Sequence, residues 1–384
     1  MHVSDRLHAA LAVVALLLFT ATTVRADDRV KAETRVDQVR AEYGLTGEDV
    51  IIAILDRGID YEHPDFRNAD GTTRILAIYD LTDPSGASDP ANPTGVGTVY
   101  TRAEIDAALA GGSPLAHRDA VGHGTSTAGL AGGNGRASDG EIEGMAPNAT
   151  FVIVKFTTEG APAHDGEPAE APFYNPGLLP TALDYVLGLA DAAELPIVFL
   201  ANFGSVGGPM DGTSDFAQAI DSRFGAGIPG RIFVTGTSDD GGVDNHAGGT
   251  VGQGQTVELQ FQKGYAGFLR INLWYPDSDR FGVEVVTPSG SSGPLATPMT
   301  NGTQASASGT GFTYFHNGSA VDFFGADNDK REILIDFSGV PGTYTLRLTG
   351  TAVADGRFDA SLNPSNFYAQ PDNRFLTFVE EGYQ

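Results

Sequence analysis

The stretch that decides the fold is VIIAILDRGID, residues 50–60. Six apolar residues lead into the carboxylate of Asp56, and a glycine and a second carboxylate follow. A continuous apolar run that closes at a glycine predicts a strand buried on both faces, as in a parallel sheet. Asp56 then lies at the carboxyl end of that strand, where open α/β sheets carry their functional groups. An aspartate at a strand end is also a common turn former, so this stretch alone leaves both interpretations open.

A second segment, DAVGHGTSTAG at residues 119–129, holds a histidine between two glycines. Imidazole, as a side chain, is the usual general base for a hydroxyl nucleophile, which makes His123 a candidate base. An aspartate can hold such a histidine in one tautomer and stabilise the imidazolium. A lone Gly-His-Gly is usually an ordinary loop histidine, but the two segments in this order indicate a catalytic pair of Asp56 and His123.

These segments resemble the motifs of the subtilisin-like serine proteases (subtilases, peptidase family S8). ILDRGID at 54–60, followed by HPDF at 63–66, resembles the aspartate motif. GHGT at 122–125 resembles the histidine motif, and GMAPNA at 144–149 resembles the segment that normally comes next. The family order of the triad is Asp, His, Ser. The resemblance implies a serine endopeptidase in which Asp56 orients the base and His123 is the base.

The beginning of the chain indicates export. Residues 1–26 combine Arg6, an apolar core from 9 to 19 and the small-x-small sequence VRA at 24–26. This pattern predicts a secretory signal peptide that is too short to span a bilayer, and an uncleaved anchor is the alternative. Residues 27–47 are a polar lead-in segment, too short for an independent pro-domain. We therefore expect a secreted or periplasmic protein.

The chain carries a formal net charge of −26 and has no cysteine. An acidic surface argues against nucleic acid as a partner, and against a membrane after signal cleavage, so we expect a protein or peptide substrate. The lack of cysteine excludes disulfides and thiol chemistry. We predict no metal site from ligand spacing. Calcium is an alternative in the acidic loop 158–176 and at Asp327, Asp329 and Glu332, but we favour a solvated loop for the first and a charged hairpin tip for the second.

Strands and helices alternate across 48–240, which predicts an α/β fold with a doubly wound parallel sheet, subtilisin-like but incomplete. From 250 to 363, apolar and polar residues alternate between turns, which predicts an inserted antiparallel β-sandwich. This insert resembles the jelly-roll insert of some bacterial subtilases. We therefore expect the N-terminal portion of the catalytic domain at 48–249, the insert at 250–363, and a truncated return to the catalytic domain at 364–384.

The resemblance implies two further site segments. Asn202, Phe203 and Gly204 stand where subtilases usually have a Ser-Leu-Gly whose backbone pairs with the peptide substrate. Thr237 stands at the oxyanion position, where the family has an asparagine. Loss of such a donor costs roughly two to three orders of magnitude in turnover. Backbone pairing survives the first change, although the bulk of Phe203 should reshape the pocket.

The family's serine segment, Gly-Thr-Ser-x-Ala-x-Pro, does not occur in the sequence. Three Gly-Thr-Ser triplets end at Ser126, Ser214 and Ser238, and we assign these serines to a helix start, a helix N-cap and a tight turn. We therefore expect this chain alone to be inactive, with Asp56 and His123 present and the nucleophile missing. The alternative function is that of a non-catalytic peptide-binding pseudoenzyme.

Overall fold

The computed structural model describes residues 26–384 except 91, 165, 205–206, 237–241, 365–372 and 381–384. Residues 1–25 of the expected signal peptide and the expected oxyanion residue Thr237 therefore lie outside the described residues. The chain divides into two compact units, residues 1–174 with 185–198, and residues 175–184 with 199–384. Within the described part of the chain, no helix has the length and apolar character that crossing a bilayer requires.

The stretch that opened the sequence analysis forms the strand β1 (Ile51–Asp56), and each of its residues is buried. β1 pairs in parallel with β4 (Thr150–Lys155), and β4 pairs in parallel on its other side with β2 (Ile75–Asp80). The register places both Asp56 and Asp80 opposite Lys155, so three polar side chains meet where these strands end.

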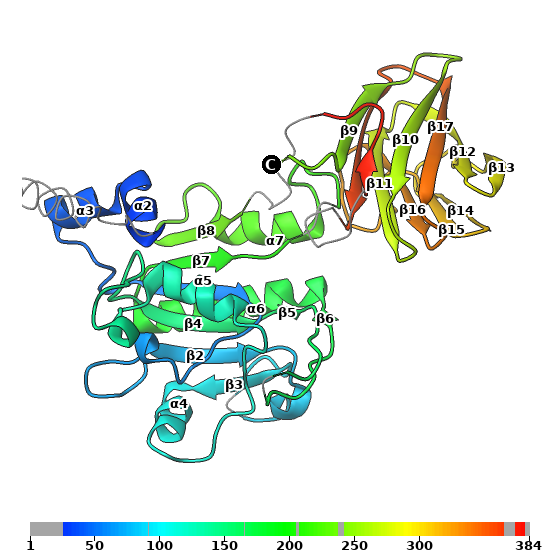
Figure 1. Cartoon of the computed structure of the whole chain (residues 1–384). Coiled ribbons are helices and arrows are strands. Elements are labelled where there is room, and N and C mark those ends of the chain that lie inside the picture. The colour runs from blue at the N-terminus through cyan, green and yellow to red at the C-terminus, as the bar shows by residue number, and fades with distance from the viewer. Residues whose placement is uncertain are drawn as a thin grey trace, which may run out of the picture. The chain divides into compact units, whose positions relative to one another are not determined.

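The complete sheet has the strand order β3-β2-β4-β1-β7-β8 (Figure 1). Here β3 spans Thr98–Thr101, β7 spans Ile197–Ala201 and β8 spans Arg231–Thr235. The predicted α/β fold is confirmed, with one difference. The edge strand β3 is antiparallel to β2, because the chain returns directly beside β2 before it enters the next helix.

The helices begin and end close to the positions that the sequence indicates. Thr101 caps α4 in a capping box with Glu104, and Gly44 ends α3 in the left-handed conformation. Ser214 caps α7, as predicted for this serine. The α-helices are α2 (Ala26–Glu33), α3 (Val36–Tyr43), α4 (Arg102–Leu109), α5 (His123–Gly132), α6 (Leu179–Ala193) and α7 (Asp215–Phe224). The short 3₁₀ helices are η1 (Pro64–Phe66), η2 (Pro84–Gly86), η3 (Arg136–Ser138) and η4 (Pro176–Leu178).

The second unit contains two antiparallel sheets that form the predicted sandwich-like insert (Figure 1). Their orders are β13-β12-β17-β10-β19 and β14-β15-β16-β11-β18-β9. Side chains of both sheets share one core, in which the rings of Phe261 and Phe337 lie 5.1 Å apart. The strands are β9 (His246–Thr250), β10 (Thr256–Lys263), β11 (Leu269–Pro276), β12 (Arg280–Thr287), β13 (Gly290–Leu295), β14 (Gln304–Gly309), β15 (Phe312–Asn317), β16 (Lys330–Phe337), β17 (Gly342–Ala352), β18 (Arg357–Asn363) and β19 (Arg374–Phe375).

The sheets of the insert extend beyond the expected range 250–363 at both ends. β9 begins at His246 and pairs with β18, and β19 pairs with β10. Val379 forms a further antiparallel bridge to Ala247 of β9. The reason is that β9 is the glycine-rich sequence HAGGT, which has too few apolar residues to show strand alternation. The described residues of 364–384 therefore pair with the sandwich.

Candidate active site

Asp56 and His123 are in direct contact. Asp56 ends β1 with a fully buried side chain, and His123 is the first residue of α5. The Nδ1 atom of His123 lies 2.6 Å from Oδ1 of Asp56. Since the charged carboxylate can only accept, Nδ1 carries the proton and donates it to Asp56. The other ring nitrogen, Nε2, is then the atom that can take a proton from a nucleophile.

The carboxylate of Asp56 is held in place by more than the histidine. The backbone N–H of Arg57 donates to its Oδ1 at 2.7 Å. Burial raises the pKa of Asp56 above its ordinary value, although the hydrogen bond with His123 acts in the opposite direction. A carboxylate that has lost its water in this way depends on the imidazole and the backbone for stabilisation, which fixes the orientation of the ring.

The glycine after the histidine permits the contact. A Cβ atom on Gly124 would lie 2.1 Å from the carbonyl oxygen of Gly58 and 3.2 Å from the Cβ of Asp56. No side chain fits at that separation, so only glycine lets α5 approach the loop after β1 this closely. The Gly-His-Gly pattern therefore has a packing reason that the sequence alone did not provide.

Asp119 fastens the start of α5, a role that the sequence analysis missed. Its Oδ1 accepts the backbone N–H of Gly122 at 3.0 Å, and its Oδ2 accepts the backbone N–H of Thr125 at 2.8 Å. The hydroxyl of Thr125 donates to the same carboxylate and accepts the backbone N–H of Asp60 at 2.8 Å. The segment that carries His123 is thus tied to the loop that follows Asp56.

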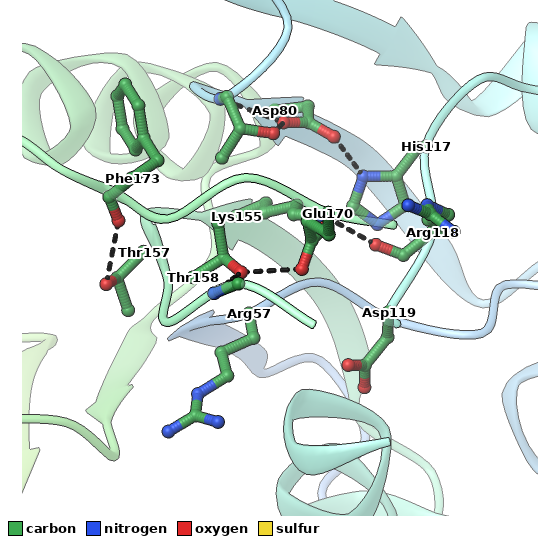
Figure 2. Close-up of polar contacts among 12 residues, drawn as sticks. Arg57, Asp80, His117, Arg118, Asp119, Lys155, Thr157, Thr158, Glu170 and Phe173 are labelled. Atoms are coloured by element: carbon green, nitrogen blue, oxygen red, sulfur yellow. Dashed lines mark hydrogen bonds and ion pairs between the residues drawn. The ribbon is translucent and has the colours of Figure 1, made fainter. Parts of the chain in front are cut away.

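A second histidine–aspartate pair lies at the end of β2, which is separated from β1 by β4. Figure 2 shows His117 with its Nδ1 atom directed at Asp80, at 2.7 Å from Oδ2. Both side chains are buried, and Nε2 of His117 accepts the backbone N–H of Ile59 at 3.1 Å. The pair therefore holds the loop after β1 in place through the hydrogen bond from Ile59 to His117. Asp80 ends an apolar strand as Asp56 does, so the strand-end signal could have identified it.

Glutamates of the acidic loop 158–176 pair with arginine and lysine side chains of the same unit. The sequence had left a solvated loop and a calcium site as the two alternatives for this loop. Glu170 contacts the buried ammonium group of Lys155, which also donates to the carbonyl oxygen of Arg118 at 2.8 Å (Figure 2). Glu159 pairs with Arg57 at 2.7 Å, and Glu167 pairs with Arg118 at 2.8 Å. These carboxylates are therefore occupied by the chain's own cations.

The other candidate residues occupy separate places. Asn202, Phe203 and Gly204 follow β7 directly and belong to the second unit. Ser126 lies within α5, and its hydroxyl donates to the carbonyl oxygen of Gly122 at 2.8 Å. Ser238 lies outside the described residues.

Glu332, one of the three residues of the possible calcium loop, is buried in β16. Its carboxylate accepts hydrogen bonds from the side-chain amides of Asn272, at 2.6 Å, and Asn317, at 2.7 Å. Among the described residues, Asp327 and Asp329 do not form a three-residue ligand cluster with it. The expected loop ligands are therefore not gathered around one point.

Comparison with known proteins finds a similarity to one family over part of the first unit. Residues 47–171 match the model of the subtilase family, Peptidase_S8. The chain is 30% identical over 112 residues to the "Major intracellular serine protease" of Bacillus subtilis (strain 168), a match that covers 29% of this chain and 25% of that protein. The match thus spans about a quarter of the length of this curated relative. The structure of the CspB protease of Clostridium perfringens is similar with a TM-score of 0.70 and 22% identity, over 91% of this chain and 67% of that chain. This structural likeness shows the fold alone.

Proposed function

Because residues 47–171 are a subtilase-family domain in which Asp56 contacts His123, we propose that this chain is part of a secreted subtilisin-like serine endopeptidase. The single observation that supports this function best is the 2.6 Å contact between Nδ1 of His123 and the buried Asp56. A solvated loop histidine would have no reason to meet a buried carboxylate. The family match over the same residues gives the contact its chemical interpretation.

In the proposed mechanism, Nε2 of His123 takes the proton of a serine hydroxyl as that oxygen attacks the peptide carbonyl. Asp56 keeps the ring in the required tautomer and stabilises the imidazolium that forms. His123 then delivers the proton to the departing amine. Ser126 and Ser214 already serve helix α5 and the cap of α7, so we assign the nucleophile to a serine outside residues 1–384.

The substrate in this proposal is a protein or peptide. The backbone of Asn202, Phe203 and Gly204 would pair with it as an added strand, and Thr237 would occupy the oxyanion position. Export to the periplasm or the medium belongs to the same proposal. The acidic net charge of −26 supports a partner that is neither nucleic acid nor an anionic membrane.

The substitution at position 237 favours a second candidate function. A threonine in place of the family's asparagine removes the usual side-chain amide donor to the oxyanion, which catalysis needs and peptide binding does not. A pseudoenzyme that binds peptides through the segment after β7 would tolerate this change. The two functions differ in whether a peptide bond is broken.

The test uses the protein as its whole gene encodes it. We expect hydrolysis of an unfolded protein substrate, labelling by a fluorophosphonate that reacts with activated serines, and a fall in kcat/KM of about 10³-fold or more in the His123→Ala variant. His164→Ala is the matched control, since His164 is only half-buried and its Nδ1 contacts the carbonyl oxygen of Pro162. Full activity in His123→Ala would refute the proposal. Peptide binding without labelling or hydrolysis would favour the pseudoenzyme.

A further inference from the structure

Two neighbouring strands of the sandwich and the segment around Glu380 bring a histidine and two carboxylates to one face of a sheet. In the pairing of β9 with β18, His246 lies opposite Ser361 and Gly248 lies opposite Asp359. On the other edge of β9, Val379 pairs with Ala247, which puts Glu380 beside His246. Figure 1 shows the red C-terminal segment running next to β9. The two faces of a strand alternate, so these side chains point away from Ala247, which lies in the core.

The polar atoms of this cluster converge. The ligand atoms of His246, Asp359 and Glu380 all lie within 4.8 Å of one another, and Nε2 of His246 is 3.7 Å from Oδ1 of Asp359. In a tetrahedral zinc site with bonds of about 2.0–2.2 Å, neighbouring ligand atoms lie about 3.3 Å apart. The histidine and aspartate are close to that spacing. Glu380 is exposed, so its side chain can close the remaining gap.

Gly248 leaves the space in which the cluster forms. A Cβ atom at this position would lie 2.4 Å from Oε2 and 2.7 Å from Oε1 of Glu380. The carboxylate of Glu380 therefore lies where any other residue would put its side chain. Gly248 lies on β9 between β18 and the segment around Glu380, and its substitution would move Glu380 without removing a ligand.

We propose that His246, Asp359 and Glu380 bind a divalent transition-metal ion of the zinc type. One imidazole nitrogen and two carboxylate oxygens suit such an ion, whereas Ca²⁺ prefers a shell made only of oxygen atoms. A cavity of about 500 Å³, which the three residues line together with Asn272 and Trp274, leaves room for water or a further ligand at the fourth position. The chain contains no cysteine, so no thiolate competes for the ion.

The ion would fasten the segment around Glu380 to the sandwich. That segment is held to β9 by the bonds from Gly248 N to Phe378 O, at 2.9 Å, and from Glu380 N to His246 O, at 3.3 Å. Arg357 competes with the ion, because it donates to both oxygens of Asp359 at 3.2 Å. Its own side chain is 64% exposed, so it can turn into solvent when the ion binds.

Calorimetric titration of the metal-stripped full chain with Zn²⁺ tests the proposal. We expect one site whose affinity falls at least tenfold in Asp359→Asn, Glu380→Gln and Gly248→Ala, while circular dichroism shows that each variant keeps its fold. Two controls should bind as the wild type does. Glu258→Gln removes an exposed carboxylate of the same unit that pairs with Arg347, and His123→Ala removes a partly exposed histidine that contacts the buried carboxylate of Asp56.

Co²⁺ provides a spectroscopic check, since a tetrahedral nitrogen–oxygen site gives visible absorption that Glu380→Gln should remove. Three results would overturn the proposal. The first is that Zn²⁺ does not bind to the wild type, and the second is that Asp359→Asn, Glu380→Gln and Gly248→Ala bind Zn²⁺ with the affinity of the wild type. The third is that the site is lost in His123→Ala alone. Tighter binding of Ca²⁺ than of Zn²⁺ would overturn the assignment of the ion. These outcomes are independent of proteolytic activity, so the proposal stands or falls apart from the proposed function.

Discussion

Acidification should destabilise the sandwich through His316, a fully buried histidine of β15. Its Nδ1 lies 2.8 Å from the Tyr314 hydroxyl and its Nε2 lies 2.5 Å from the Tyr275 hydroxyl. The Tyr314 hydroxyl donates its proton to the carbonyl oxygen of Ala296, so it must accept from Nδ1–H. Nε2 therefore accepts from Tyr275, and the native site holds a neutral ring with no place for a second proton.

Burial lowers the pKa of His316 from its ordinary value of 6.5 to about 3, and the nearby charges of Arg331 and Arg280 act in the same direction. Above pH 6.5 the ring is neutral in the folded and the unfolded chain, so it contributes no pH dependence. Below pH 6.5 the unfolded chain takes up the proton and the folded chain does not. The free energy of unfolding therefore falls with pH by up to about 1.4 kcal/mol per unit until pH 3 is approached.

Between pH 6 and pH 4 this single group should remove about 2 to 2.5 kcal/mol of stability from the wild type. The assay is urea unfolding of the full chain at several pH values, followed by fluorescence. Trp274 is the one tryptophan of the sequence and is buried in β11 of the same unit, so its emission reports on the sandwich. The His316→Gln variant lacks the titrating ring. Its unfolding free energy should therefore fall by about 2 to 2.5 kcal/mol less than that of the wild type between pH 6 and pH 4.

The measured quantity is the pH dependence of the difference in unfolding free energy between wild type and His316→Gln. The difference at a single pH is not informative, because His316→Gln also loses hydrogen bonds at every pH. His164→Gln is the control, since His164 is only half-buried whereas His316 is fully buried. Equal slopes for wild type and His316→Gln would refute the reasoning. So would an NMR titration of the His316 ring in the folded protein with a midpoint near 6.5.

Two further predictions concern the first unit. Gly58→Ala should destabilise the protein by about 1 kcal/mol or more, because Gly58 has a φ of +116° and a Cβ there would lie 2.6 Å from the carbonyl oxygen of Arg118; an unchanged melting temperature by circular dichroism would contradict this. Glu170→Gln should lower the free energy of unfolding by about 3 kcal/mol, because it removes the carboxylate that pairs with the buried ammonium of Lys155. Glu159→Gln, which breaks a more exposed pair, should cost about 1 kcal/mol or less, and equal losses in these two variants would show that burial is not the deciding factor.

The fold could be predicted where a strand or helix shows a clear local pattern, such as an apolar run, a helix cap or an alternation of apolar and polar residues. β1 and β4 are continuous apolar runs, and both were expected as buried strands. The capping box of Thr101 and Glu104 could also be predicted, since its two partners are three residues apart. β9 was missed because its sequence HAGGT has no alternation, and only its pairing with β18 makes it a strand.

The candidate site shows the same division. Asp56 and His123 were selected from the sequence because each lies in a short recognisable motif. The supporting pair of His117 and Asp80 was missed, because 37 residues separate its members and no motif connects them. The proposed metal cluster spans an even longer stretch, from His246 to Glu380, with its ligands on β9, on β18 and on the segment after β19.

The sequence by itself therefore determined the buried strands, the helix ends and the identity of the general base that we propose, His123, and of Asp56, the carboxylate that orients it. These features depend on interactions between residues close in the chain, such as apolar runs, caps and glycine turns. Only the tertiary structure decided which distant groups meet: the neutral ring of His316 between two tyrosines, Lys155 against Glu170, and Glu380 above Gly248. The physical reason is that such contacts depend on strand register and burial, and neither quantity is a property of any short segment.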